Sequence, residues 1–190
     1  FIVIAVALDE DLEAVQELAK DTTYPVLMDK DHLLTELYAI SNVPTVIWID
    51  EKGKIARPAA SEFGTDVFTE ITGIKREFHM QQVRDWVKEG KVPSDASYAV
   101  SDLSYEEIQA RLYFRIAAHL RRENQLPEAE TYFKKAEELA PLDFTIVRAS
   151  MPLRGKNPFG EEFFELYKKY QEAGSPYHGI PRRKNLNLSN

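Results

Sequence analysis

The sequence of 190 residues contains no cysteine. This absence argues against a disulfide-stabilised secreted domain, although it says little about a chain that is a piece of a longer protein. No run of 18 or more apolar residues occurs either, so we expect no transmembrane span. The glycine-rich phosphate-binding motifs and the serine-nucleophile motif are also missing. Nucleotide binding and serine hydrolysis therefore have no support.

Basic charge is scarce, because the net charge is −7 and the isoelectric point is near 5.2. This balance gives no general support for nucleic-acid or anionic-membrane binding, so we expect neither partner. The one basic cluster, 181–184, falls in a polar tail, 177–190, that we expect to be flexible. The four histidines are far apart and have no partner at ligand spacing, so we expect no metal site and no cofactor: His32, His79, His119 and His178. The composition does not indicate a cellular compartment.

The first half of the chain alternates between strand and helix signals. The expected elements are a buried parallel strand 1–8, a helix after the capping residues 9–11, a strand 26–28, a helix opened by Asp29 and Asp31, and a strand 45–49. A turn at 50–53 and a partner strand from Ile55 then predict a hairpin. A helix over about 74–88 ends at Gly90, and 91–97 has the composition of a linker. The two helical crossovers imply parallel neighbours for the early strands.

The segment YPVLMDKDHLLTELYAISNVPTVIWIDEKGKI, residues 24–55, resembles the thioredoxin-like domains of the TlpA/ResA and peroxiredoxin-related group. The resemblance extends over residues 1–90 through the order of the elements. It implies a three-layer α/β/α fold and a cis bond between Val43 and Pro44. The alternative for Pro44 is an ordinary trans proline that begins a strand.

In that family, the residue before the cis proline pairs through its backbone with an extended substrate peptide. The resemblance assigns this role to Val43, with Pro44 setting the turn and Thr45 starting the strand, and it implies a thiol or disulfide protein as partner. The family's reactive residue precedes the central strand, which here is 1–8, so no catalytic residue can be named in this chain. Either the protein lacks the redox helix, or the chain is a truncation, for instance one created by reading a selenocysteine codon as a stop.

The region 104–176 is helical in character, and its spacing resembles one tetratricopeptide repeat. Small and large side chains there alternate as two closely packed antiparallel helices require: Tyr113, Ala117, Ala129, Phe133, Ala136 and Pro141. One repeat cannot form a solenoid, so a helical bundle that packs on the first domain or mediates dimerisation is the preferred interpretation. A closing helix over 160–174 is expected to turn four aromatic residues inward: Phe163, Phe164, Tyr167 and Tyr170.

The sequence thus predicts an α/β protein with a partial thioredoxin-like domain (1–90), a linker (91–103), a tetratricopeptide-like helical segment (104–176) and the tail. The expected function is thiol-disulfide or peroxide oxidoreduction, with the reactive cysteine or selenocysteine upstream and the chain inactive as it stands. The alternative is a non-catalytic interaction or scaffold module. Because strand 1–8 would expose apolar surface, we also expect it to be covered, by a homo-oligomer, the helical segment or residues 58–72.

Overall fold

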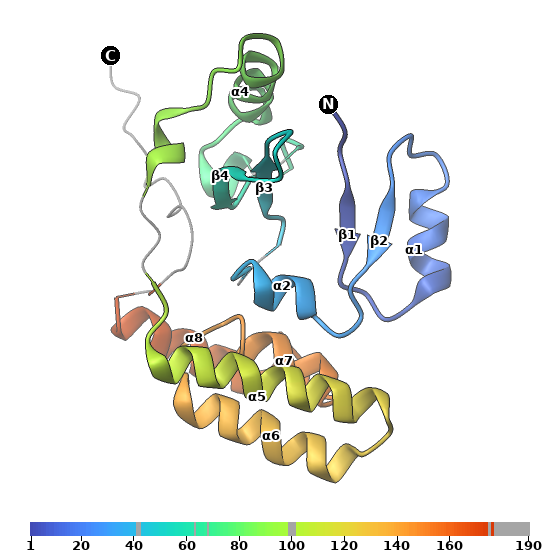
Figure 1. The fold of residues 1–190 in the computed structure, drawn as a ribbon, viewed down its shortest axis with the longest axis vertical. Helices are drawn as coiled ribbons and strands as arrows, with labels where there is room; N and C mark the ends of the chain where they lie inside the picture. Colours follow the sequence, from blue (N-terminus) through green and yellow to red (C-terminus); the bar gives the residue numbers. More distant parts are fainter. Residues whose placement is uncertain (41–42, 63, 68, 99–101, 175, 177–190) are drawn as a thin grey trace. The chain divides into compact units, whose positions relative to one another are not determined.

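A computed structural model of the chain describes residues 1–40, 43–62, 64–67, 69–98, 102–174 and 176 (Figure 1). It divides into two compact units, which are described one at a time. Unit 1 comprises Phe1–Ser41 and Leu103–Pro176, and unit 2 comprises Asn42–Asp102. The domain limits expected from the sequence, 1–90 and 104–176, cut the chain differently and stay a prediction. The expected flexible tail lies outside the described residues.

Unit 1 begins with a β-α-β arrangement. Strand β1 (Ala5–Ala7) pairs in parallel with β2 (Val26–Met28), and α1 (Leu12–Ala19) connects them. The Asp11 carboxylate accepts a hydrogen bond from the Ala14 amide at 3.1 Å, so it caps α1 as expected. The parallel pairing is confirmed, but a strand over 1–8 is wrong in extent. Residues 1–4 lie outside the strand with exposed side chains, because β2 pairs only with the three residues of β1.

The short helix α2 (Leu33–Leu37) follows β2, and Asp29 fixes its first turn. The Asp29 carboxylate accepts hydrogen bonds from the amides of Leu33, Leu34 and Thr35 at 2.9, 2.8 and 3.2 Å. Three of the amides that a helix leaves without intrahelical partners are thereby satisfied. Asp31 instead forms ion pairs with two arginines of the helical part of unit 1. Of the two carboxylates expected to open this helix, Asp29 does so.

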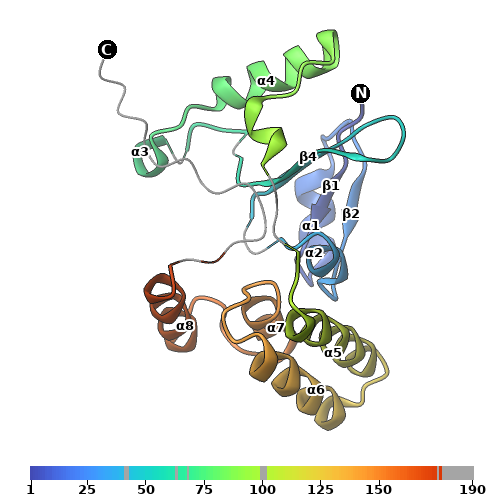
Figure 2. The same ribbon diagram turned by 60° about the vertical axis from the view of Figure 1, so that its left-hand side comes forward.

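Two long helices dominate the rest of unit 1. Helices α5 (Tyr105–Arg122) and α6 (Leu126–Leu139) lie side by side in both views (Figures 1 and 2). Ser104 and Glu107 form a reciprocal capping box at the start of α5. The core between the helices is built from small and aromatic side chains that are all at most 2% exposed: Ala110, Phe114, Ala117, Ala129, Phe133 and Ala136. The small residues let the helices approach closely, and Phe114 and Phe133 meet edge to face at 5.8 Å.

The closing helices α7 (Val147–Leu153) and α8 (Glu161–Glu172) form a second cluster. Phe144, Val147, Met151 and Leu166 are its buried members, with Phe163 and Tyr170 partly buried against them. Of the four aromatic residues of α8 expected to face inward, Phe163 and Tyr170 do so and the other two do not. Phe164 and Tyr167 are 62% and 41% exposed, because the helix turns Leu166 inward instead.

Unit 2 is built on an antiparallel hairpin of β3 (Val46–Ile49) and β4 (Ile55–Ala60). Asp50 shapes its turn, because one carboxylate oxygen accepts hydrogen bonds from the amides of Lys52 and Lys54. The short helix α3 (Thr69–Thr72) and the longer α4 (Arg76–Glu89) follow. Gly90 ends α4 in the left-handed region with φ of 68°, as its position in the sequence predicts. A 3-10 turn, η1 (Ser94–Ser97), follows the helix.

The described residues thus combine helices with four short strands, which pair as β1-β2 and β3-β4. This arrangement agrees with the coarse α/β class. The three-layer thioredoxin-like sheet expected from the resemblance is a finer statement, and it is treated below as a proposal.

Candidate functional site

The three residues expected to bind substrate lie immediately before β3. The Val43–Pro44 bond is cis, as the resemblance implies. Val43 is 63% exposed, Pro44 is also exposed, and Thr45 is half-buried where the chain enters the strand. The preceding residue lies outside the described residues. The segment is thus accessible to a peptide, and its role in substrate binding stays a prediction.

The hairpin that follows this segment carries a buried polar network. Arg57 of β4 is 1% exposed. Its Nε and Nη2 each donate to one oxygen of Asp95 at 2.9 Å, and Nη2 also donates to Glu62 at 2.7 Å. Burial by itself lowers the pKa of Arg57, but the hydrogen bonds to Asp95 and Glu62 raise it above the ordinary arginine value. Arg57 therefore keeps its charge beside the two carboxylates.

Two tryptophan rings stack beside this network. The Arg57 guanidinium lies 5.3 Å from the centroid of the Trp48 ring, and Trp48 stacks on Trp86 of α4 at 4.8 Å. His79 of α4 is 6% exposed, and its Nδ1 lies 3.6 Å from Glu62. An imidazole beside a carboxylate can take part in proton transfer. Here, however, Glu62 is already bound by Arg57, and both Glu62 and His79 are buried, which favours a structural role.

Asp95 also changes the interpretation of residues 91–97. The sequence predicts a linker there, but Asp95 in η1 forms the two-point contact with Arg57 on β4. The segment is therefore fixed to the hairpin over Ser94–Ser97. A short polar stretch after a helix stop gives no sign of this contact, because its partner lies 38 residues earlier in the chain.

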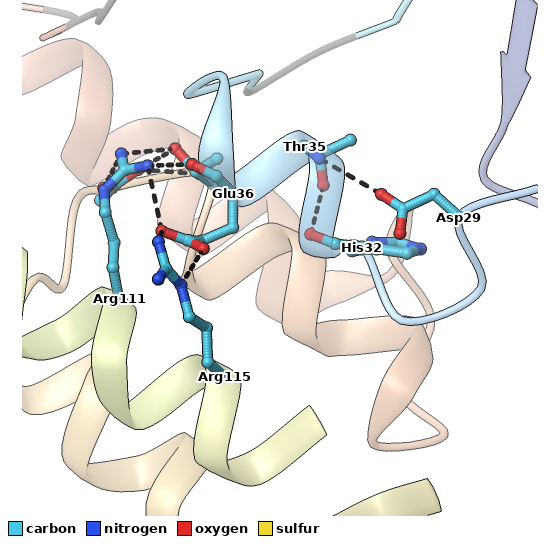
Figure 3. A network of polar contacts seen from close by, with 8 residues as sticks. Asp29, His32, Thr35, Glu36, Arg111 and Arg115 are labelled. Atoms are coloured by element: carbon cyan, nitrogen blue, oxygen red, sulfur yellow. Dashed lines mark hydrogen bonds and ion pairs between the residues drawn. The ribbon is translucent and has the colours of Figure 1, made fainter. Parts of the chain in front are cut away.

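A second buried network lies in unit 1, where α2 meets α5 (Figure 3). Glu36 is 1% exposed, and its carboxylate accepts hydrogen bonds from Arg115 Nε at 2.6 Å and Nη2 at 3.2 Å. Arg111 Nη1 donates to the Glu36 carbonyl oxygen, while its Nη2 donates to Asp143 at 2.9 Å and to Thr145 at 3.2 Å. The network thus ties α2 to α5 and to the loop after α6 through five polar residues.

Sequence reasoning missed this second network. Glu36 looks like an ordinary exposed helix charge, and its partners lie 75 and 79 residues further along the chain. One signal was present in the sequence. Arg111 stands three residues before Phe114, on the face of α5 that carries the apolar core, and a charge there requires a buried partner.

The residues expected to pack the helical segment are placed as follows. Ala117, Ala129, Phe133 and Ala136 belong to the core between α5 and α6, and Tyr113 packs partly buried against it. Pro141 is exposed and lies just after α6. These positions describe a helical hairpin, which a tetratricopeptide repeat and a simple bundle have in common.

Within the described ranges, no group of three or more histidine, aspartate or glutamate side chains is arranged to hold a metal ion. No helix in this part of the chain is both long and apolar enough to cross a membrane. Comparison with protein-family models, with curated proteins and with solved structures finds no match to this chain. The function proposed below is therefore based on the residues of the chain and their geometry.

Proposed function

We propose that this chain belongs to a thioredoxin-like protein that carries out thiol-disulfide or peroxide oxidoreduction. The chain has no cysteine, so in this proposal the reactive thiol or selenol is supplied by polypeptide outside it. The chain contributes the wall on which an extended substrate peptide lies. Val43 offers its backbone to the peptide, Pro44 sets the turn, and Thr45 leads into β3.

The observation that carries the proposal is the order and pairing of the elements around this segment. A parallel β-α-β unit, a short helix, the Val-Pro-Thr segment with Val43 and Pro44 exposed, an antiparallel hairpin and a closing helix follow each other along the chain. This is the order implied by the resemblance from the central strand onward. The exposure of Val43 supports the assigned role, because only an accessible backbone can add a strand of substrate.

The experiment uses the complete product of the gene that encodes this chain. Its rate of insulin disulfide reduction, and separately of hydrogen peroxide reduction, is measured against the Val43→Pro variant. Proline at 43 removes the backbone N–H with which the substrate would pair. Loss of one such hydrogen bond in the transition state predicts a fall in kcat/KM of about tenfold. Val43→Thr keeps the N–H and the branched shape, so it should retain nearly full activity.

The outcomes separate redox catalysis from a non-catalytic scaffold. Activity that falls in Val43→Pro and persists in Val43→Thr supports the proposal. A complete protein that reduces neither substrate refutes oxidoreduction and favours the scaffold alternative. Equal activity in both variants would show that substrate does not pair with Val43, even if the protein is a redox enzyme.

A further inference from the structure

A positively charged side chain on α7 lies beside an aromatic ring of α8 and another in the turn that precedes this helix. The guanidinium of Arg148, on α7, is 4.8 Å from the centroid of the Phe163 ring and 5.5 Å from that of Phe159. Arg148 is half-buried. Phe163 in turn contacts Phe164 and Tyr167, at 5.4 and 5.9 Å between centroids. One cation is thus set into a continuous aromatic surface.

Arg148 differs from every other arginine in the described part of the chain. Eight of the nine arginines there form an ion pair with a carboxylate: Arg57, Arg76, Arg84, Arg111, Arg115, Arg121, Arg122 and Arg154. Arg148 forms none with a described residue, and its guanidinium lies over the rings of Phe159 and Phe163 instead. The fold supplies a carboxylate for each of the other eight arginines, so the lack of one beside Arg148 requires an explanation.

Burial without a counter-ion is unfavourable for this side chain. Loss of solvent lowers the pKa of the Arg148 guanidinium, and no neighbouring carboxylate opposes the effect. The rings compensate in part, because their faces attract the cation. A ring contacts the flat face of a guanidinium, however, and leaves the N–H groups at its edge available to a planar acceptor. None of its nitrogens is among the fully buried donors that lack a partner in the described residues.

The surface beside Arg148 is apolar and open. Phe159, Phe164 and Tyr167 are 66%, 62% and 41% exposed, although the rings of the first two are large enough to fill a core position. Exposed aromatic clusters with an arginine at their centre have the composition of protein-binding surfaces. The combination of one unpaired cation and several open rings therefore suits a ligand that carries a carboxylate next to an apolar side chain.

We propose that Arg148, together with Phe159, Phe163 and Phe164, binds a peptide segment of a partner protein in which an aspartate or glutamate adjoins a hydrophobic residue. The guanidinium edge donates two parallel hydrogen bonds to the carboxylate, and the exposed rings cover the neighbouring apolar side chain. The carboxylate of the peptide is complementary in charge to Arg148, the one described arginine for which the described residues supply no carboxylate. This binding site is independent of the redox proposal, since it uses none of the residues 43–45.

The test selects a random dodecapeptide phage library on the purified chain, and then measures the affinity of a synthetic enriched peptide by calorimetry. We expect enrichment of Asp or Glu beside an aromatic or aliphatic residue. Arg148→Met should weaken binding by about tenfold or more, because one charge-assisted bidentate contact is lost. Arg148→Lys should restore part of the affinity. Arg84→Met, which removes the same charge from an exposed position on α4, is the matched control and should bind as the wild type does.

A double-mutant cycle links the arginine to the carboxylate. The peptide with Asp or Glu replaced by Asn or Gln should lose about tenfold on the wild type and almost nothing on Arg148→Met. Removal of an unpaired cation should also leave the thermal unfolding midpoint unchanged or higher. Enrichment of peptides without acidic residues, binding of inorganic phosphate in place of peptide, or an unchanged affinity in Arg148→Met would each overturn the proposal. So would a lower midpoint in Arg148→Met, because it would show that the charge serves the fold.

Discussion

Replacement of Glu36 by glutamine tests whether α2 is fixed to the helical part of unit 1. The carboxylate is buried and accepts two hydrogen bonds from Arg115, with Arg111 Nη1 at 3.9 Å as a further cation. Glutamine has the same shape but removes the negative charge. It also places a donor group where the fold supplies only donors, so at least one contact with Arg115 becomes repulsive.

The expected loss follows from the exposure of each partner. Breaking a fully buried ion pair costs about 3–5 kcal/mol, because the remaining charge is left without compensation. Arg115 is 45% exposed and can return to water, and Arg111 keeps its contact with Asp143, so the loss is smaller here. We expect Glu36→Gln to reduce the free energy of unfolding by about 2–3 kcal/mol. Arg115→Met should cost a similar amount, since it leaves the Glu36 carboxylate buried with fewer donors.

The assay is urea unfolding followed by two signals. Both tryptophans of the chain, Trp48 and Trp86, lie in unit 2, so their fluorescence reports on that unit. Circular dichroism at a helix-sensitive wavelength also includes the long helices of unit 1. The Glu36→Gln variant should therefore shift the helical transition. Glu51→Gln, in the exposed hairpin turn, is the matched control and should change the free energy by less than about 0.5 kcal/mol.

A double-mutant cycle gives the decisive quantity. Glu36→Gln and Arg115→Met together should cost less than the sum of the single changes, with a coupling free energy of about 1–2 kcal/mol. Additive losses would refute the contact between α2 and α5. A single variant that destabilises the chain without coupling would show only that the position is buried.

Two further predictions concern other buried ionisable side chains, Arg57 and His32. Arg57→Met should leave the carboxylates of Glu62 and Asp95 facing each other, and it should reduce the free energy of unfolding by about 3 kcal/mol in the tryptophan signal; an unchanged midpoint would disprove the network. Burial lowers the pKa of His32 below 6.5, against smaller raising effects of a backbone hydrogen bond and of Asp29 and Glu10. As the pH falls, His32 therefore takes up a proton in the unfolded state at a higher pH than in the folded state. The contribution of His32 to the free energy of unfolding is thus present above about pH 6.5 and is lost as the pH falls below it. His32→Asn, which tolerates the left-handed backbone at this position, should flatten that part of a stability-against-pH curve, and an identical curve would contradict the prediction.

The local features of the fold could be predicted because neighbouring residues determine them. Asp11 caps α1, Gly90 ends α4, and Asp50 turns the hairpin, each through bonds that span a few residues. The alternation of alanine and aromatic residues likewise predicted the contact between α5 and α6, since the 3.6-residue period places them on one face. The parallel pairing of β1 and β2 followed from the helical connection between them.

The tertiary structure alone decided which charged side chains form ion pairs with one another. Glu36 and Arg115, or Arg57 and Asp95, are ordinary surface residues by sequence, and only the fold brings each pair together across 79 and 38 residues. It also decided that β1 is three residues long and that Phe164 faces solvent, because both depend on what a neighbouring element covers. Arg148 is a further example: nothing in its sequence context indicates its surroundings, and only the tertiary structure shows a cation beside two rings with no described carboxylate as ion-pair partner. The sequence by itself determined local bonds and helix faces, which short separations control, whereas the ion pairs and the exposed aromatic surface depend on contacts between distant segments.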